Sequence, residues 1–305
     1  MQLSRRKFVA LATVTVAGVG TSCAVRPAAT ATANRSRLVA FDALAIFDPR
    51  PVGQIAVDLF PERAGELMAS WRTRQFEYTW LRSTADRYAD FWKTTRDALI
   101  FTGRSLGIEL PAVKVGRLMQ GFLELRAYPD VPAALTSLRS AGFRLAILSD
   151  FTSAMLNAGV GNSHLDGVFD ALLSTDLVQI YKPAPAAYRM AMNSLGVERD
   201  AVTFVPSAAW DAAGSRWFGY NTFWLNRQKV PAEELDVAAD ATADHMAGFL
   251  TYVGLQVPRE KSQSKSVNLA GNPRNPLKNA VGRSTGVPLA PFDSLRSLMA
   301  GQRNG

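Results

Sequence analysis

The segment F-D-A-L-A-I-F-D-P runs from Phe41 to Pro49 and follows a short apolar run that begins at Leu38. Short apolar runs bounded by polar residues are typical of buried strands. The pattern predicts a strand over Leu38–Asp42 that ends on a carboxylate. In open α/β sheets, ligands bind beyond the carboxyl ends of the strands. Asp42 is therefore expected where such a sheet carries its chemistry.

Strand and helix signals alternate along the chain after this segment. Further strands are predicted over Phe143–Ser149, Phe169–Ser174, Val202–Val205 and Asn221–Leu225, and helices over Pro132–Ala141 and Pro185–Leu195. Between Pro61 and about Leu125, apolar and aromatic residues recur at helical spacing. The alternation predicts an α/β fold with a parallel sheet and helices on both faces. The segment from Pro61 predicts a helical insert after the first strand.

The net charge of +8 does not predict nucleic-acid binding, because it comes from the two ends of the chain. Residues 1–33 carry four basic residues and no acid, and residues 258–305 carry eight basic residues and two acids. The segment 34–257 is left with a net charge of −2. A basic face on the folded part, which nucleic-acid binding requires, is therefore not expected. The tail 258–305 lacks periodicity and is expected to be disordered, with a short helix over Phe292–Met299.

The N-terminus has the composition of an export signal. Basic residues in S-R-R-K-F-V (Ser4–Val9) precede an apolar run over Phe8–Gly20 and then the small residues of Ala28–Ala33. The paired arginines resemble a twin-arginine signal. We therefore expect residues 1–33 to be a cleaved signal peptide and the protein to be periplasmic or secreted. The apolar run is too short to span a bilayer, so no stable membrane span is expected after processing.

Cysteine and histidine are scarce. Cys23 is the only cysteine and lies in the expected signal, so disulfides, a thiolate nucleophile and Cys-ligated metals are excluded from the mature chain. His164 and His245 are the only histidines, and both are expected at the surface or at helix caps. A histidine-based triad or a zinc site is therefore not expected.

Four motifs fall at ends of the predicted strands or starts of the predicted helices. They are F-D-A-L from Phe41, L-S-D from Leu148, Y-K-P from Tyr181 and S-A-A-W-D from Ser207. In this order they resemble the haloacid dehalogenase superfamily. Together with W-R-T-R-Q-F-E-Y-T-W-L-R (Trp71–Arg82), they resemble its type II L-2-haloacid dehalogenases. The resemblance covers about Leu38 to Leu250 and implies a Rossmann-like core (34–52 and 127–257) with a helical cap (53–126).

The resemblance also implies roles for catalytic residues. Asp42 matches the nucleophile that displaces halide from C2 of a 2-haloacid and forms an ester, which water then hydrolyses. Arg72 matches the arginine that receives the leaving halide. Lys182 matches the lysine that keeps the nucleophile ionised, and Asp211 the distal carboxylate that pairs with this lysine.

The residues expected to contact the substrate follow from the same resemblance. Ser149 matches the group that binds the substrate carboxylate, and Tyr188 a tyrosine near the nucleophile. The remaining expected substrate-binding residues are Phe91, Trp210, Leu44 and Asp150. The substrate would be a small anionic haloacid, no cofactor would be needed, and the family implies a homodimer.

Leu44 argues against phosphatase chemistry. Phosphatases of this superfamily carry a second aspartate two residues after the nucleophile, where it transfers protons and supports a Mg²⁺ site. Leu44 occupies that position and can do neither, so no metal is expected. Asp48 lies too far along the chain to replace that aspartate and is expected to be a turn residue before Pro49.

Several positions depart from the family pattern. Ile46 replaces a threonine, Asp150 an asparagine, and Pro206 and Ala208 two polar residues that orient the hydrolytic water. Ser207 would compensate in part, and Asp150 could pair with Arg72. Three interpretations therefore stay open: a 2-haloacid dehalogenase, an inert or carboxylate-binding member, and another hydrolase such as a phosphatase or phosphonatase.

Overall fold

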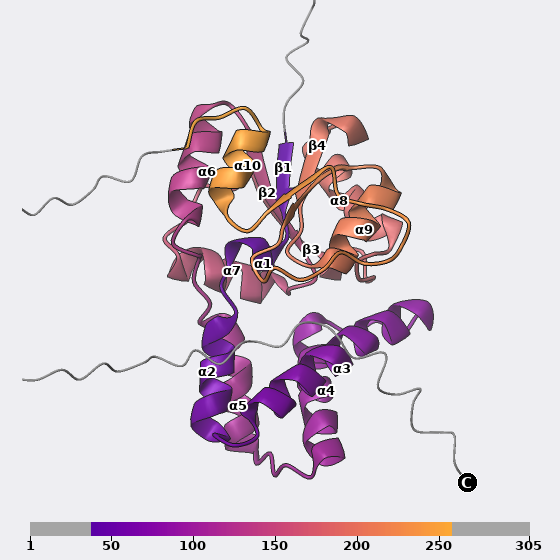
Figure 1. Cartoon of the computed structure of the whole chain (residues 1–305). Helices are drawn as coiled ribbons and strands as arrows, with labels where there is room; N and C mark the ends of the chain where they lie inside the picture. The colour runs from indigo at the N-terminus through magenta and orange to yellow at the C-terminus, as the bar shows by residue number, and fades with distance from the viewer. Residues whose placement is uncertain (1–37, 258–305) are drawn as a thin grey trace, which may run out of the picture. The chain divides into compact units, whose positions relative to one another are not determined.

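The computed structural model describes residues 38–257 (Figure 1). The expected signal peptide 1–33, the start of the predicted core at 34–37, and the expected tail 258–305 with its helix Phe292–Met299 lie outside the described residues. The helices, strands, cores and cavity of the fold are those of residues 38–257.

A six-stranded parallel sheet forms the centre of the fold, in the order β3-β2-β1-β4-β5-β6. The strands are β1 (Leu38–Phe41), β2 (Arg144–Ser149), β3 (Ala171–Ser174), β4 (Val202–Val205), β5 (Asn221–Leu225) and β6 (Ala241–Ala243). Ala40 of β1 pairs with Ala146 of β2 on one side and Phe204 of β4 on the other. The predicted α/β fold with a parallel sheet is confirmed. Only the short strand β6 was not predicted.

Side chains of β1 alternate between two hydrophobic cores, because successive residues of a strand point to opposite faces. Val39 and Phe41 belong to one core, and Leu38 and Ala40 to the other. The first core is covered by α6 (Val131–Ser140), α7 (Ser153–Asn162) and α10 (Met246–Tyr252), and the second by α8 (Pro185–Leu195) and α9 (Ala209–Phe218). Figure 1 shows α6 and α10 on one side of the sheet and α8 and α9 on the other. Burial on both faces explains why β1 is apolar throughout.

The helical insert consists of α2 (Arg50–Leu59), α3 (Ala64–Thr84), α4 (Phe91–Leu106), α5 (Ala112–Gln120) and the 3₁₀ turn η1 (Gly121–Leu123). The sequence predicted helical spacing from Pro61 to about Leu125, and the structure interrupts it between Thr84 and Phe91. The side chain of Asp90 accepts a hydrogen bond from Lys93 N and caps a new helix there. Helix α2 was missed because its proline and glycine weaken the helical signal, although proline is tolerated in a first turn.

Hydrogen bonds join the insert to the rest of the fold. Tyr181 OH donates to Ala89 O at 2.5 Å, and Tyr181 N donates to Ser83 Oγ at 3.2 Å. The described residues group as one compact unit. The division into a core (34–52 and 127–257) and a cap (53–126) stays a prediction.

The polar residues expected at turns and caps lie there. Asp48 accepts a hydrogen bond from Arg50 N at 3.0 Å, directly before α2. His245 caps α10 by accepting from Gly248 N, and His164 is exposed in a turn. None of these three side chains lines the cavity described next.

Candidate active site

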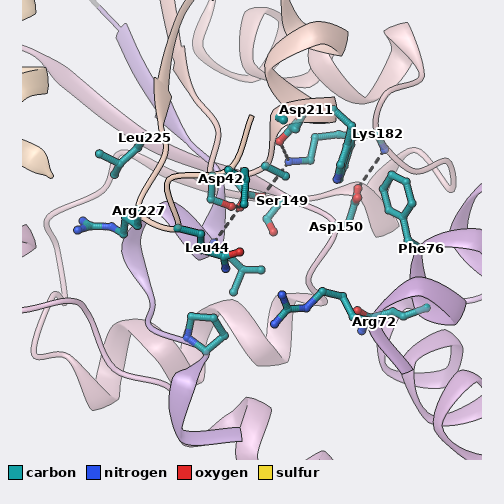
Figure 2. A pocket seen from close by; sticks show the side chains of 18 of the residues that line it. Asp42, Leu44, Arg72, Phe76, Ser149, Asp150, Lys182, Asp211, Leu225 and Arg227 are labelled. Atoms are coloured by element: carbon teal, nitrogen blue, oxygen red, sulfur yellow. Dashed lines mark hydrogen bonds and ion pairs between the residues drawn. The ribbon is translucent and has the colours of Figure 1, made fainter. Parts of the chain in front are cut away.

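Polar side chains from neighbouring strands converge at the carboxyl end of the sheet. Asp42 follows β1, Ser149 ends β2 and Asp150 follows it, and Ser207 comes two residues after β4. Because β2, β1 and β4 are adjacent, these residues meet at one edge. They line a cavity of about 980 Å³, to which α3, α4 and the connection between β5 and β6 also contribute (Figure 2).

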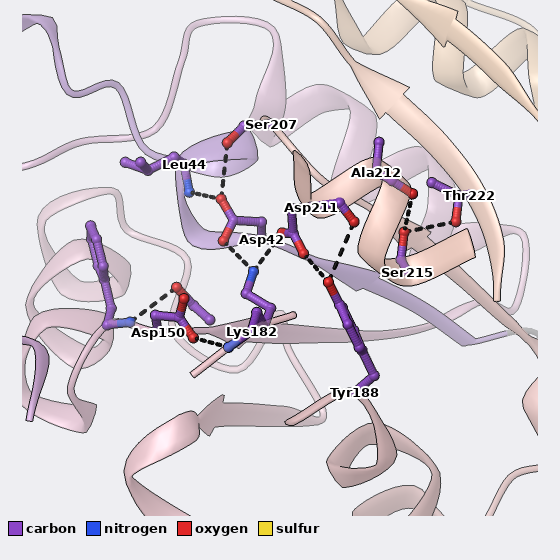
Figure 3. Close-up of polar contacts among 12 residues, drawn as sticks. Asp42, Leu44, Asp150, Lys182, Tyr188, Ser207, Asp211, Ala212, Ser215 and Thr222 are labelled. Carbon is purple, nitrogen blue, oxygen red and sulfur yellow. Dashed lines mark hydrogen bonds and ion pairs between the residues drawn. The ribbon is translucent and has the colours of Figure 1, made fainter. Parts of the chain in front are cut away.

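The carboxylate of Asp42 accepts three hydrogen bonds. Its Oδ1 lies 2.9 Å from Lys182 Nζ, and its Oδ2 accepts from Leu44 N at 2.9 Å and from Ser207 Oγ at 3.0 Å (Figure 3). The contact with Leu44 N comes from the local fold, since Asp42 is the N-cap of the single-turn helix α1 (Ala43–Ile46), whereas Lys182 and Ser207 reach Asp42 from distant parts of the chain. Asp42 is 9% exposed, so an oxygen remains within reach of a ligand in the cavity.

Lys182 links Asp42 to a second, deeper carboxylate. Its Nζ lies 2.6 Å from Asp211 Oδ2, and both side chains are 1% exposed. Burial by itself would lower the pKa of Lys182, but the charges of Asp211 and Asp42 raise it above its ordinary value. Lys182 is therefore a permanent cation that holds the nucleophile candidate in place.

Asp211 is oriented from behind the cavity by Tyr188. Burial raises the pKa of Asp211, while the charge of Lys182 opposes this increase. Tyr188 OH donates to Asp211 Oδ1 at 2.6 Å, and its ring is fully buried between α8 and the sheet. Tyr188 does not line the cavity. The sequence placed it among the substrate-binding residues, whereas the structure places it one layer behind, as a support for Asp211.

Asp150 adds a third carboxyl group to this cluster. Its Oδ1 accepts a hydrogen bond from Lys182 N at 3.1 Å. Burial raises the pKa of Asp150 to about 7, and the nearby charges of Asp211 and Asp42 add to the increase while Lys182 opposes it. Near neutral pH this group is therefore divided between its neutral and ionised forms. The pairing of Asp150 with Arg72 that the sequence suggested stays a prediction.

Arg72 supplies a cation from the insert. It lies on α3 and lines the cavity, and Figure 2 shows it with Phe76 on one side of Asp42. Burial lowers the pKa of Arg72, but an arginine remains protonated in proteins. Ser149 lines the cavity as well, and its Oγ accepts from Phe151 N at 3.2 Å. Its hydroxyl proton can therefore be donated to an anion.

Aromatic rings form the wall around these polar groups. The ring centroids of Phe76 and Trp210 lie 4.7 Å apart, and those of Phe91 and Phe151 lie 5.4 Å apart. Such rings exclude water and strengthen electrostatic interactions inside a site.

All the site residues expected from the sequence lie at this site, and all except Tyr188 line the cavity. Those that line the cavity are Asp42, Leu44, Arg72, Phe91, Ser149, Asp150, Lys182, Trp210 and Asp211. The sequence did not predict the wall formed by the β5–β6 connection, because loop residues carry no periodic signal. The sequence analysis expected Ser207 to compensate in part for lost water-orienting residues, but it did not predict the hydrogen bond of Ser207 to Asp42. Ile46 is buried in the core and offers the nucleophile no polar contact.

The model of the haloacid dehalogenase-like hydrolase family matches residues 20–219. The chain belongs to this family. An (S)-2-haloacid dehalogenase of Pseudomonas sp. (strain YL) is 42% identical over 203 residues, which is 66% of this chain and 88% of that protein.

Solved structures of family members agree with the fold. The crystal structure of the L-2-haloacid dehalogenase RSc1362 is 39% identical, with a TM-score of 0.70 over 72% of this chain and 99% of that one. A structure of the L-2-haloacid dehalogenase from Xanthobacter autotrophicus with chloropropionic acid covalently bound is 31% identical, with a TM-score of 0.65 over 71% of this chain and 98% of that one.

Two further findings concern residues 38–257 as a whole. Within them, His, Cys, Asp and Glu side chains form no group of three or more that could hold a metal ion. Among the helices of this part of the chain, none is long and apolar enough to cross a membrane.

Proposed function

We propose that this protein hydrolyses the carbon–halogen bond of 2-haloacids, giving a halide ion and a 2-hydroxy acid. The observation that carries the proposal is the placement of Asp42. Its carboxylate is held by Lys182 and lies in an aromatic-walled cavity that also contains Arg72. The names of the similar proteins, (S)-2-haloacid and L-2-haloacid dehalogenase, support the same reaction.

In the first step, a carboxylate oxygen of Asp42 attacks C2 of the substrate. The new C–O bond forms as the carbon–halogen bond breaks, and the halide leaves with the bonding electrons. Arg72 stabilises the charge that appears on the halide, and Ser149 donates to the substrate carboxylate. Lys182 keeps Asp42 ionised beside an anionic substrate, because an opposite charge favours the ionised form of a carboxyl group.

In the second step, water attacks the carbonyl carbon of the aspartyl ester. The negative charge that forms on the carbonyl oxygen needs hydrogen-bond donors, and Leu44 N and Ser207 Oγ both reach Asp42 Oδ2. The acyl C–O bond then breaks, and one proton of the water passes to the departing ester oxygen, so that the 2-hydroxy acid leaves. The second proton is released to the solvent, and the Asp42 carboxylate retains one oxygen from the water. Asp211 accepts a hydrogen bond from Lys182 Nζ at 2.6 Å and so holds this cation beside the ester.

A second candidate function is binding of a small carboxylate without turnover. Pro206 and Ala208 offer no side-chain hydrogen bond to a water molecule, which leaves Ser207 as the hydroxyl group at this position. An enzyme that forms the ester but hydrolyses it slowly would behave in this way.

The first test measures halide release from L-2-chloropropionate and monochloroacetate in the presence of EDTA. p-Nitrophenyl phosphate with Mg²⁺ is offered in parallel. We expect halide release that survives EDTA and is abolished by Asp42→Asn. Turnover by Asp42→Asn would remove Asp42 from the role of nucleophile. Phosphate release without halide release would favour the phosphatase interpretation instead.

Single-turnover reactions in H₂¹⁸O separate the two steps. Mass spectrometry of the peptide containing Asp42 should show one ¹⁸O after turnover. A lasting mass increase equal to the 1-carboxyalkyl group of the substrate would show that the ester forms but is not hydrolysed, which is the second candidate function.

We propose further that residues 1–33 direct export by the twin-arginine pathway and that the protein is a periplasmic or secreted homodimer. The paired Arg5 and Arg6 before an apolar run support export, and the family resemblance supports the dimer. Replacing both arginines by lysine should retain the protein in the cytoplasm in a fractionation experiment. Light scattering on the processed protein measures the oligomeric state.

A further inference from the structure

The cavity is much larger than a three-carbon haloacid. Its volume of about 980 Å³ lies at the upper end of the range of roughly 300–1,000 Å³ that is common for pockets holding drug-sized ligands. The groups with assigned roles, Arg72 and Ser149, account for the halide and the carboxylate. The wall that remains continues from Asp42 in another direction, and Figure 2 shows Leu225 and Arg227 on the opposite side of Asp42 from Arg72 and Phe76.

This remaining wall is apolar, and we call it the β5 wall. Its surface consists of Leu44, Tyr128, Val230 and Leu235, and the buried side chains of Val52 and Leu225 lie beneath it. Val230 and Leu235 belong to the connection between β5 and β6, residues 226–240, which contains no helix or strand. Loops of about this length without secondary structure are uncommon in compact domains and are usually functional. Asn226 holds the start of the connection in place by two hydrogen bonds to the backbone of Val230, at 2.7 and 3.1 Å.

The charges along the β5 wall disfavour a second anionic group on the ligand. Arg227 also lines the cavity, but both of its terminal nitrogens bind Asp130, at 3.0 and 3.1 Å, and its guanidinium lies 4.0 Å from the centre of the Tyr128 ring. Its charge is therefore already balanced. Farther along the connection, Glu233 and Glu234 are exposed at the cavity and would repel a carboxylate. The wall thus suits an uncharged hydrocarbon group.

We propose that the β5 wall is a subsite for a long apolar substituent at C2, so that the substrates of this protein include medium-chain 2-haloacids. The inference rests on the proposed function, because the carboxylate and halide end of the ligand is placed by Ser149 and Arg72. The first carbons of the tail pass Leu44 beside the nucleophile, and the later carbons contact Val230 and Leu235, which keep exposed surface. Each methylene group transferred from water to this wall should strengthen binding by about fourfold.

The test uses saturated carboxylates, which bind without reacting, and the intact protein. Calorimetric titration gives Kd for propionate, butyrate, hexanoate and octanoate, and for the dicarboxylate suberate. We expect Kd to fall by about fourfold per methylene from propionate through octanoate. We also expect suberate to bind more than tenfold more weakly than octanoate. A Kd that stays flat or rises beyond butyrate, or suberate binding as tightly as octanoate, would overturn the subsite.

A matched pair of variants locates the effect. Val230→Trp fills the β5 wall from the connection, whereas Val113→Trp makes the same change at an 83% exposed position on α5. The ratio of the propionate Kd to the octanoate Kd should fall at least tenfold in Val230→Trp and stay at its wild-type value in Val113→Trp. An unchanged ratio in Val230→Trp would place the tail elsewhere and contradict the proposal.

Turnover of 2-bromopropionate and 2-bromooctanoate distinguishes failure of the subsite from failure of the proposed function. Release of bromide from the short acid together with a flat Kd series would retain the dehalogenase and remove the subsite. A falling Kd series without bromide release from either acid would remove the dehalogenase, and the β5 wall would remain a binding site for a carboxylate with an apolar tail.

Discussion

Replacing Asp150 by asparagine should make the protein more stable at alkaline pH. Asparagine has the same shape and keeps an oxygen to accept the hydrogen bond from Lys182 N, so the change removes mainly the charge. The carboxyl group of Asp150 is buried near Asp42 and Asp211, and burial raises its pKa from 3.8 to about 7. The ionised form is therefore the costly one in the folded state.

The sign follows from proton binding. Between pH 3.8 and about 7, Asp150 is protonated more often in the folded than in the unfolded chain, so its contribution to stability falls as the pH rises through this window. Each unit of difference between the folded-state and unfolded-state pKa corresponds to about 1.4 kcal/mol in the free energy of unfolding. From pH 5 to pH 8 the wild type should lose about 3 kcal/mol that Asp150→Asn does not lose.

Urea denaturation at pH 5 and pH 8 measures this difference as the free energy of unfolding of each protein. Asp166→Asn is the control, since Asp166 is exposed and lies outside the cavity. Asp150→Asn should gain about 3 kcal/mol relative to the wild type between the two pH values, and the control less than about 0.5 kcal/mol. If Asp150→Asn and the wild type change in parallel with pH, the buried carboxyl group does not titrate in this window and the reasoning fails.

Three other substitutions test the remaining contacts of the site. Ser207→Ala should lower steady-state halide release by about 100-fold, because it removes one hydrogen-bond donor from the second step, while the burst of halide in the first turnover survives. Ser140→Ala on the surface of α6 is the control. A lost burst, or an equal effect of Ser140→Ala, would contradict this role of Ser207. Lys182→Met should abolish turnover and lower the free energy of unfolding at pH 8 by about 3–5 kcal/mol, since the buried carboxylates lose their cation. If the variant is as stable in urea at pH 8 as the wild type, the charges of these carboxylates are balanced in another way. Tyr188→Phe should lower kcat and leave KM unchanged, because Tyr188 contacts Asp211 and does not line the cavity. A raised KM with unchanged kcat would instead place Tyr188 against the substrate.

Local patterns in the sequence were sufficient to predict most of the secondary structure. The strand over Val202–Val205, the strand over Asn221–Leu225 and the helix over Pro185–Leu195 agree with β4, β5 and α8 at both ends. These segments have strong apolar periodicity and clear end signals, such as Gly196 in a left-handed conformation after α8. Helix α2 and strand β6 were missed, because a proline in a first turn and a three-residue edge strand leave almost no local signal.

The local sequence pattern was enough to predict that Asp42 lies at the end of a buried parallel strand, and the order of the motifs predicted roles for Lys182 and Asp211. The tertiary structure alone decided which groups share the cavity. It placed Tyr188 behind Asp211, brought Ser207 within 3.0 Å of Asp42, and added Val230 and Leu235 as a wall. The physical reason is that strand and helix formation depend on neighbours within a few residues. Contacts such as that of Ser207 with Asp42 join residues 165 positions apart and exist only once the sheet has aligned its carboxyl ends.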